Sequence, residues 1–329
     1  MHRLLTLLCA APLVACGAID VHVPTGRPRG VAALGSEAVA RFEYELVSTS
    51  PLEPAWTDAL AEVSSATLMV RLADETEPAP IKFQFWRSQV AEERWGPRAP
   101  AVVVTPILGG GQSISRSQCR YLVEAGFHVA LVDRGPRVLA AHWPVEALEL
   151  YMRRGIAGRR AVVDWLQARP DVDPRRISAM GISMGGIITT VLTAVEPRLE
   201  SAVIALAGAD VPAIISASSE DRLIVWRQAR AAELGVDEAQ VEARLRQALP
   251  DDPAVLAGAI DPRKVLQITA SLDTVVPTAR QDALWEALGR PLRYDLPTGH
   301  YTGIVYLPYI LETCVRWWEA RYRDEGVAK

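Results

Sequence analysis

Residues 181–186 read Gly-Ile-Ser-Met-Gly-Gly, and this short stretch decides the fold. The apolar run before it, residues 176–182, has the composition of a buried strand, and residues 184–195 continue as a helical segment. The pattern G-x-S-x-G between a strand and a helix is typical of a nucleophile elbow, which holds a serine hydroxyl clear of the sheet. We therefore interpret Ser183 as a nucleophile. The alternative is a glycine-rich turn without catalysis.

Apolar runs and helical segments alternate on both sides of this turn. Such alternation predicts an α/β fold with a mostly parallel, doubly wound sheet. An antiparallel pair with a turn between its strands precedes the alternation. Strands are predicted at residues 66–72, 81–87, 101–105, 127–132, 176–182, 201–207, 265–269 and 292–296, and helices at 113–125, 154–168, 184–195, 278–288 and 304–322.

One long segment interrupts the alternation. Residues 208–262 contain no strand pattern but two helical ones, at 221–234 and 237–249. Asp237 and Gln240 have the spacing of a capping box at the start of the second helix. A helical insertion at the ends of strands is a natural lid over a binding site. We expect a signal peptide at 1–15, a tether and N-terminal extension at 16–65, and one catalytic domain at 66–329 that includes this lid.

A serine nucleophile needs a base, and the base needs an acid that orients it. His300 is the only histidine after the elbow, and it follows the last predicted strand. Asp273 follows the strand at 265–269, so it lies at the carboxyl edge of the sheet, where ligands bind. We predict a triad of Ser183, His300 and Asp273. Asp210, after the preceding strand, is the alternative acid.

These motifs and their order resemble the serine-hydrolase branch of the α/β-hydrolase superfamily. The resemblance covers residues 100–323, with S-L-D-T-V-V-P at 271–277 similar to the acid loop and T-G-H at 298–300 similar to the histidine loop. It implies an eight-stranded sheet with a cap after the sixth strand. Residues 17–98 match no motif of the family beyond the leading hairpin.

The resemblance also implies an oxyanion hole made of two backbone N–H groups. One belongs to the residue after the nucleophile, Met184, and the other to the loop after the third strand, where Leu108 is the expected donor and Gly109 the alternative. That loop lacks the H-G-x motif common in the family. No nucleotide motif or metal-ligand spacing is present, so we expect no cofactor and no metal.

The expected activity is hydrolysis of carboxylic esters through an acyl-enzyme on Ser183, with a small-molecule ester as substrate. A peptidase or amidase on the same fold is the alternative, and acidic residues of the lid, Glu220 and Asp221, together with Trp226 would favour it. A binding lipoprotein without catalysis is a third interpretation. A net charge of -4 gives no reason to expect a nucleic-acid partner. The sequence does not indicate an oligomeric state.

The start of the chain resembles an export signal of a bacterial lipoprotein. A positive residue precedes a short apolar run that ends at residues 13–16 in Leu-Val-Ala-Cys, similar to a lipobox. We expect lipid attachment at Cys16 and no other contact with a membrane. Because Gly17 rather than Asp follows, the outer membrane or periplasmic face is favoured, with a periplasmic or secreted protein as the alternative.

Besides the expected lipid-bearing Cys16, the expected mature chain keeps Cys119 and Cys314 as possible disulfide partners. Buried free thiols are the simpler interpretation. The family resemblance implies that the helices carrying them lie on the same side of the sheet. A disulfide then forms if their Cα atoms lie within about 7 Å.

Overall fold

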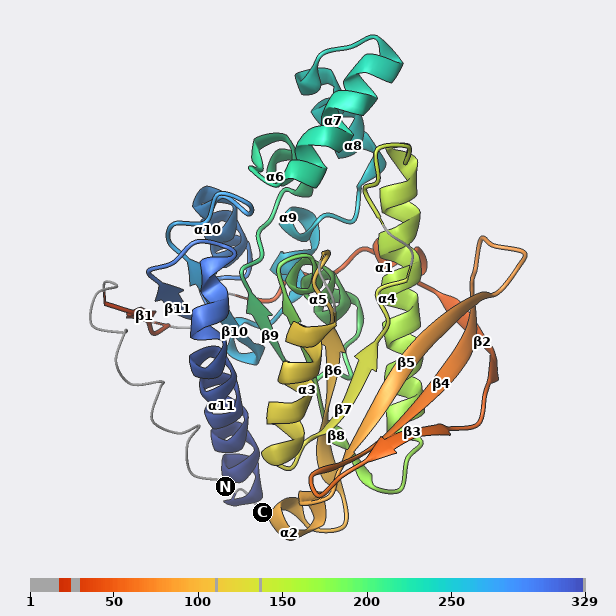
Figure 1. Cartoon of the computed structure of the whole chain (residues 1–329), viewed down its shortest axis with the longest axis vertical. Helices are drawn as coiled ribbons and strands as arrows, with labels where there is room; N and C mark the ends of the chain where they lie inside the picture. The colour runs from red at the N-terminus through yellow and green to blue at the C-terminus, as the bar shows by residue number, and fades with distance from the viewer. Residues whose placement is uncertain (1–17, 25–29, 110–111, 136–137, 328–329) are drawn as a thin grey trace.

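A single mixed sheet forms the centre of the computed structural model, which describes residues 18–24, 30–109, 112–135 and 138–327 (Figure 1). Its strands lie in the order β1-β11-β10-β9-β8-β6-β7-β5-β4-β2, and β3 pairs with β4. The predicted α/β fold with a mostly parallel sheet is confirmed. The parallel strands are β6 (Ala99–Thr105), β7 (His128–Val132), β8 (Val172–Ile182), β9 (Ser201–Ala205), β10 (Val265–Ala270) and β11 (Leu292–Leu296).

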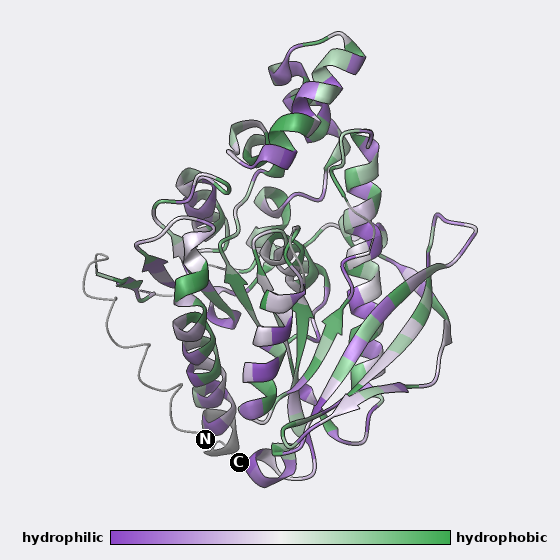
Figure 2. Ribbon diagram, in the orientation of Figure 1, coloured by the Kyte–Doolittle hydropathy of each residue, from purple (hydrophilic) through white to green (hydrophobic). Residues whose placement is uncertain are grey.

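The parallel strands are apolar along most of their length because helices cover both faces. α4 (Glu146–Gln167), α5 (Met184–Val195) and α10 (Thr278–Ala287) contribute to one hydrophobic core. α3 (Ser113–Glu124) and α11 (Leu307–Val327) contribute to the other. Figure 2 shows the central strands in the green of hydrophobic residues and mixed colours along the covering helices. None of the helices in the described part of the chain combines the length and apolar character needed to cross a membrane.

The antiparallel part of the sheet is larger than the sequence predicted. β4 (Ala61–Leu72) and β5 (Ala79–Ser88) form the expected hairpin, so the predicted boundary at residue 65 falls inside a strand. The segment expected to be a tether also supplies β1 (Asp20–His22), α1 (Ser36–Ala40), β2 (Tyr44–Thr49) and β3 (Glu53–Thr57). The eight strands that the resemblance implied are β4–β11, and β1–β3 lie at the margins. Edge strands have one solvated side, which weakens the hydrophobic pattern that a prediction needs.

Helices of the segment between β9 and β10 lie beyond the carboxyl end of the sheet, at the top of Figure 1. They are α6 (Val211–Ala217), α7 (Asp221–Leu234), α8 (Glu238–Ala248) and α9 (Pro253–Leu256). α7 matches its predicted bounds. Asp237 is the N-cap of α8, and Gln240 in its first turn completes the predicted capping box. Trp226 fixes α7 in place, since its ring is fully buried and its indole N–H donates to the carbonyl of Trp143 (2.9 Å).

The C-terminal helix differs from its predicted bounds, and it carries one of the two buried cysteines. A 3-10 turn, η4 (Thr302–Tyr306), precedes α11, so the helix expected at 304–322 is divided in two. Cys119 on α3 and Cys314 on α11 lie in the same hydrophobic core, as the resemblance implied. Both are buried free thiols, and the structure does not form the disulfide. Burial raises the pKa of each thiol.

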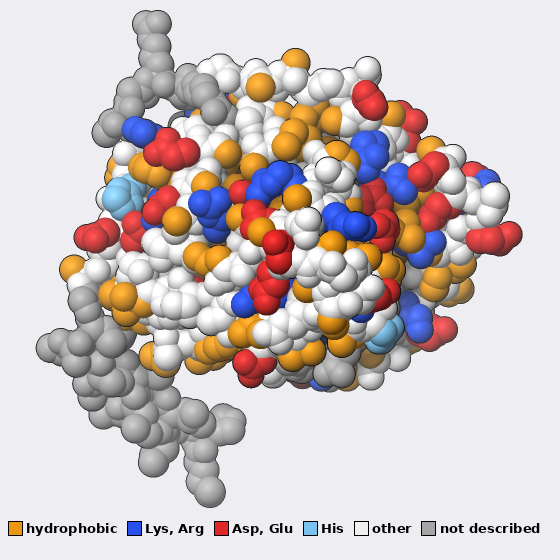
Figure 3. Space-filling model, turned by 90° about the horizontal axis from the view of Figure 1, so that it is seen from above, with side chains coloured by type: hydrophobic (Ala, Val, Ile, Leu, Met, Phe, Trp, Pro, Cys, Tyr) orange, Lys and Arg blue, Asp and Glu red, His pale blue; other side chains and the backbone are white. Residues whose placement is uncertain are grey.

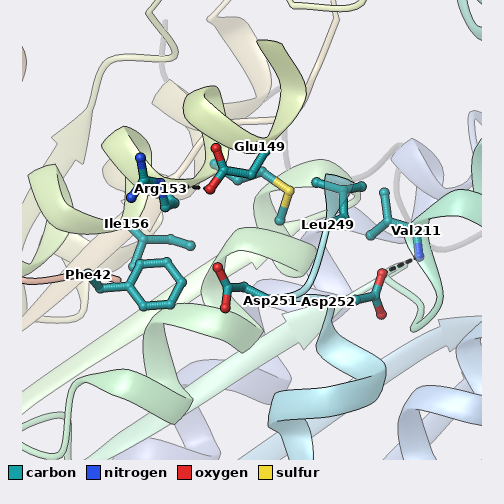
Figure 4. A pocket seen from close by; sticks show the side chains of 9 residues that line it. Phe42, Glu149, Arg153, Ile156, Val211, Leu249, Asp251 and Asp252 are labelled. Carbon is teal, nitrogen blue, oxygen red and sulfur yellow. Dashed lines mark hydrogen bonds and ion pairs between the residues drawn. The ribbon is translucent and has the colours of Figure 1, made fainter. Parts of the chain in front are cut away.

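A buried aspartate holds the base of the inserted helices beside the crevice drawn in Figure 4. The Asp252 carboxylate accepts hydrogen bonds from the backbone N–H groups of Asp210 (2.8 Å), Val211 (2.6 Å) and Ala254 (2.7 Å). Burial raises the pKa of Asp252, and the N–H donors oppose that shift. Next to it, Arg41 bridges Asp251 (2.6 Å) and Glu149 on α4 (2.5 Å). Through Asp252, the start of the insertion at residues 210–211 is joined to its last helix, α9.

Replacing Asp252 with Ala should lower the free energy of unfolding by about 3 kcal/mol or more, because three N–H groups lose a charged acceptor in a buried place. Urea denaturation of both proteins measures the difference. Asp237→Ala is the matched control, since it removes an exposed N-cap of α8 and should cost about 1 kcal/mol. Equal losses in the two variants would show that Asp252 is an ordinary cap.

Candidate active site

The turn between β8 and α5 has a backbone conformation that few residues adopt. Ser183 lies at φ 57° and ψ −125°, a region that costs a non-glycine residue roughly 1–3 kcal/mol. A Cβ atom on Gly181 would lie 2.1 Å from the carbonyl oxygen of Gly185, and one on Gly185 would lie 2.3 Å from that of Thr105. A Cβ atom on Gly186 would lie 2.7 Å from the Cβ of Ala207 and 3.0 Å from the carbonyl oxygen of Ala205. The glycines of the motif are therefore required by the approach of neighbouring backbone.

Three side chains predicted from the sequence meet at this turn. The Ser183 Oγ lies 2.9 Å from Nε2 of His300, and Nδ1 of the same ring lies 2.7 Å from Oδ2 of Asp273. The serine comes from the elbow, the aspartate from the turn after β10, and the histidine from the loop after β11. In this arrangement the imidazole can accept the serine proton while the carboxylate holds the other ring nitrogen.

The carboxylate of Asp273 is fully buried and has donors on both oxygens. Oδ1 accepts from the backbone N–H groups of Val275 and Val276, both at 2.9 Å. Oδ2 accepts from the amide of Gln281 (3.1 Å) as well as facing His300. These bonds fix the carboxylate in the plane that the imidazole needs.

Gln281 was not singled out from the sequence, although it is completely buried on α10. Its amide also donates to the carbonyl of Val276 (2.8 Å), and its Oε1 accepts from the N–H of Ala270 (3.1 Å). One side chain thus joins the end of β10, the acid loop and the acid itself. A lone glutamine on a helix carries no sequence pattern that would have found it.

The alternative acid, Asp210, is engaged elsewhere. Its carboxylate binds Arg246 (2.8 Å) and Arg280 (3.1 Å) and caps α6 at the N–H of Ala213 (3.3 Å). Its backbone lies in the left-handed region at φ 66°. The structure therefore pairs His300 with Asp273 and gives Asp210 a role at the base of the insertion.

The two predicted oxyanion donors line the cavity beside the nucleophile. Met184 begins α5, and the first N–H groups of a helix have no partner within it. Leu108 lies in the loop after β6, and both residues line the same cavity as Ser183. The carbonyl of Leu108 accepts from Arg134 (2.8 Å) and Arg222 (3.4 Å). Donation to an oxyanion by Met184 and Leu108 stays a prediction, as does the alternative donor, Gly109.

A cavity of about 350 Å³ opens beside Ser183 and His300. Its wall is mostly apolar and comes from the elbow, the inserted helices and the turn before α11. The apolar lining includes Ile107, Leu108, Ile182, Met184, Ile187, Val211, Ile214, Ile215, Leu223, Ile304, Leu307 and Ile310. Figure 3 views the molecule from this end and shows basic and acidic side chains interspersed over the surface.

Three residues of the inserted segment that were named from the sequence have different surroundings. Glu220 lines the cavity and accepts a hydrogen bond from the Tyr301 hydroxyl. Asp221 is exposed, and Trp226 is buried in the packing of α7 rather than in the cavity wall. Among the residues that the structure describes, no group of three or more His, Cys, Asp or Glu side chains is placed to hold a metal ion. Cys16 and residues 1–15 lie outside the described residues.

A known family shares the central part of this chain. The model of the prolyl oligopeptidase family matches residues 112–293, more than half of the chain. No curated protein is similar enough in sequence to match.

Solved structures with a similar fold include two esterases and a peptidase. Acetyl xylan esterase 1 from Thermoanaerobacterium sp. JW/SL YS485 has a TM-score of 0.62 and 18% identity, over 84% of this chain and 92% of that one. The acetyl xylan esterase from Paenibacillus sp. R4 has a TM-score of 0.62 and 16% identity, over 86% and 91%. A putative dipeptidyl aminopeptidase IV from Bacteroides ovatus has a TM-score of 0.54 and 16% identity, over 79% of this chain and 36% of that one. At these identities the likeness shows the α/β-hydrolase fold alone.

Replacing Gln281 with Leu should lower kcat by about 10- to 100-fold, because Asp273 loses a donor and the imidazole loses its fixed orientation. Steady-state rates on an activated ester measure this loss. The NMR signal of the proton between His300 and Asp273 should also shift or broaden.

The matched control is Gln267→Leu, because Gln267 is equally buried and its amide contacts only the backbone of Gln281 (3.0 Å). That variant should lose stability but keep kcat within a few-fold. If the two variants lose kcat equally, the effect of Gln281 is general packing and not the orientation of the acid.

Proposed function

The chain belongs to the prolyl oligopeptidase family of serine hydrolases, and on that premise we propose that it hydrolyses carboxylic esters through an acyl-enzyme on Ser183. The observation that carries the proposal is the continuous path from Ser183 through His300 to Asp273, with contacts of 2.9 and 2.7 Å, beside an apolar cavity. A serine, a base and an orienting acid in this geometry perform acyl transfer.

The reaction proceeds in two halves. His300 accepts the Ser183 proton as Oγ forms a bond to the acyl carbon, and the collapse of the tetrahedral intermediate breaks the ester C–O bond. The imidazolium gives its proton to the departing alcohol. Water then attacks the acyl-enzyme with His300 again as base, which releases the acid and restores the serine. The N–H groups of Met184 and Leu108 stabilise the oxyanion in both halves.

The shape of the cavity supports an ester rather than a long peptide as the substrate. Its wall is mostly apolar, and its volume of about 350 Å³ is near the lower end of the range for small-molecule pockets. Both acetyl xylan esterases share the fold over most of their length and of this chain. We propose that the inserted helices act as a lid, with α6 and α7 bounding the cavity.

A peptidase or amidase is the second candidate, and one observation favours it. Glu220 is the only carboxylate among the described residues that line the cavity, and it could bind a peptide amine. Its present partner is the Tyr301 hydroxyl. A binding protein without catalysis is disfavoured by the complete triad geometry, and labelling of Ser183 by a fluorophosphonate probe would exclude it.

The location of the protein is a proposal from its first residues. We propose export through a signal peptide at 1–15 and lipid attachment at Cys16, with the outer membrane or periplasmic face as the destination. Mass spectrometry of the mature N-terminus tests this, because acyl groups on Cys16 support it. Partition of an unacylated protein into the aqueous phase would overturn it.

Initial rates on p-nitrophenyl esters from short to long acyl chains test the activity, run beside one aminoacyl anilide. We expect turnover of the short esters and at least about 10³-fold lower kcat for Ser183→Ala in a folded protein. Turnover of the anilide at comparable kcat/KM would move the protein to the peptidase alternative. Unchanged ester turnover by Ser183→Ala would refute the proposed mechanism.

A further inference from the structure

Among the described residues that line the cavity, Arg222 is the one arginine or lysine. Arg222, the second residue of α7, lines the cavity together with Ser183 and His300 and is partly buried. Its Nη1 lies 3.4 Å from the carbonyl oxygen of Leu108, a neutral acceptor at the long end of the hydrogen-bond range. Most of the donors on its guanidinium group are therefore available to a ligand.

Neighbouring arginines of the lid differ from Arg222 in their partners. Arg227 pairs with Glu238 (2.7 Å), Arg246 with Asp210 (2.8 Å), and Arg230 with Glu233. Within the residues that the structure describes, Arg222 has no carboxylate within ion-pair distance. Arg244 also has none, but it is exposed and does not line the cavity.

The two acidic side chains that precede Arg222 in sequence do not neutralise it. Asp221 is exposed, and Glu220 lies two residues before Arg222. Side chains one or two residues apart do not face each other along a helix. The Glu220 carboxylate instead accepts from the hydroxyl of Tyr301, which also lines the cavity. A guanidinium group in an apolar cavity gains most from a planar anion that accepts two parallel hydrogen bonds, which is the geometry of a carboxylate.

We propose that Arg222 binds a carboxylate on the ester substrate, so that the enzyme prefers esters carrying a negative charge remote from the scissile bond. This inference rests on the proposed ester hydrolysis. A carboxylate could belong to the acyl half, as in a half-ester of a dicarboxylic acid, or to the alcohol half, as in an ester of a hydroxy acid. The competing explanation is that Arg222 only holds the loop at Leu108 in place.

Two pairs of substrates separate these cases, and the members of each pair differ only in whether the carboxylate is capped by a methyl group. For the acyl side the pair is 4-nitrophenyl hydrogen adipate and 4-nitrophenyl methyl adipate. For the alcohol side the pair is 4-(butanoyloxy)benzoate and its methyl ester. The measured quantity is kcat/KM of the free acid divided by that of the capped ester.

Replacing Arg222 with Gln should lower this ratio about 10- to 100-fold in one of the two pairs, as expected for the loss of a charge-assisted hydrogen bond. The change should fall mainly on KM, because the charge is remote from the reacting atoms. Arg222→Lys should retain part of the preference. Added salt should lower the ratio for the wild-type enzyme and have little effect on that of Arg222→Gln.

Arg244→Gln is the matched control, because it removes the same charge from the lid outside the cavity, and its ratio should equal that of the wild type. If Arg222→Gln lowers kcat/KM equally for free and capped esters, Arg222 is a positioning residue for the loop and the proposal is wrong. If the ratio does not change in either pair, the proposal is also wrong while ester hydrolysis stands. Failure of the wild type on every ester would instead overturn the proposed function.

Discussion

Backbone packing at the elbow is the constraint on which the rest of the site depends. The strands β6 and β8 pair with Thr105 opposite Gly181, so the chain leaving β6 passes directly over the turn. Gly185 lies against the Thr105 carbonyl with no room for a side chain, and Ser183 donates its N–H to the carbonyl of Ala205 (2.9 Å). These contacts hold Ser183 at positive φ and bring the Leu108 loop next to the nucleophile.

The acid end of the site depends on burial instead of on backbone strain. A carboxylate without water is stable only when its oxygens are bonded, and Asp273 has two N–H groups, an amide and an imidazole around it. This arrangement leaves a single orientation for His300. Serine and acid are thus fixed by different means, and the histidine ring is the one element that connects them.

Much of this architecture could be predicted because it follows from local patterns. The strand–turn–helix at Ser183 and the bounds of α5, α7 and β11 depend on residues close in sequence. The edge strands β1–β3 could not be predicted, because they are short and largely exposed and their partners lie far along the chain. Gln281 and Arg222 were missed for a related reason: each matters through contacts with residues distant in sequence, at Asp273 and at Leu108.

The junction between the inserted helices and the sheet bears on how such a protein can diversify. Asp252, near the end of the insertion, accepts hydrogen bonds from the N–H groups of Asp210 and Val211 at its start. Asp210 in turn binds Arg280, the neighbour of Gln281 on α10. The contacts that fix the base of the insertion therefore adjoin those that hold Asp273, through Arg280 and Gln281 on α10. α7 and α8 are not part of these contacts. Relatives can therefore exchange the inserted helices and keep a working triad when both crossover points fall inside residues 213–251. The residues at 210, 252 and 280 then remain in the same protein as the sheet.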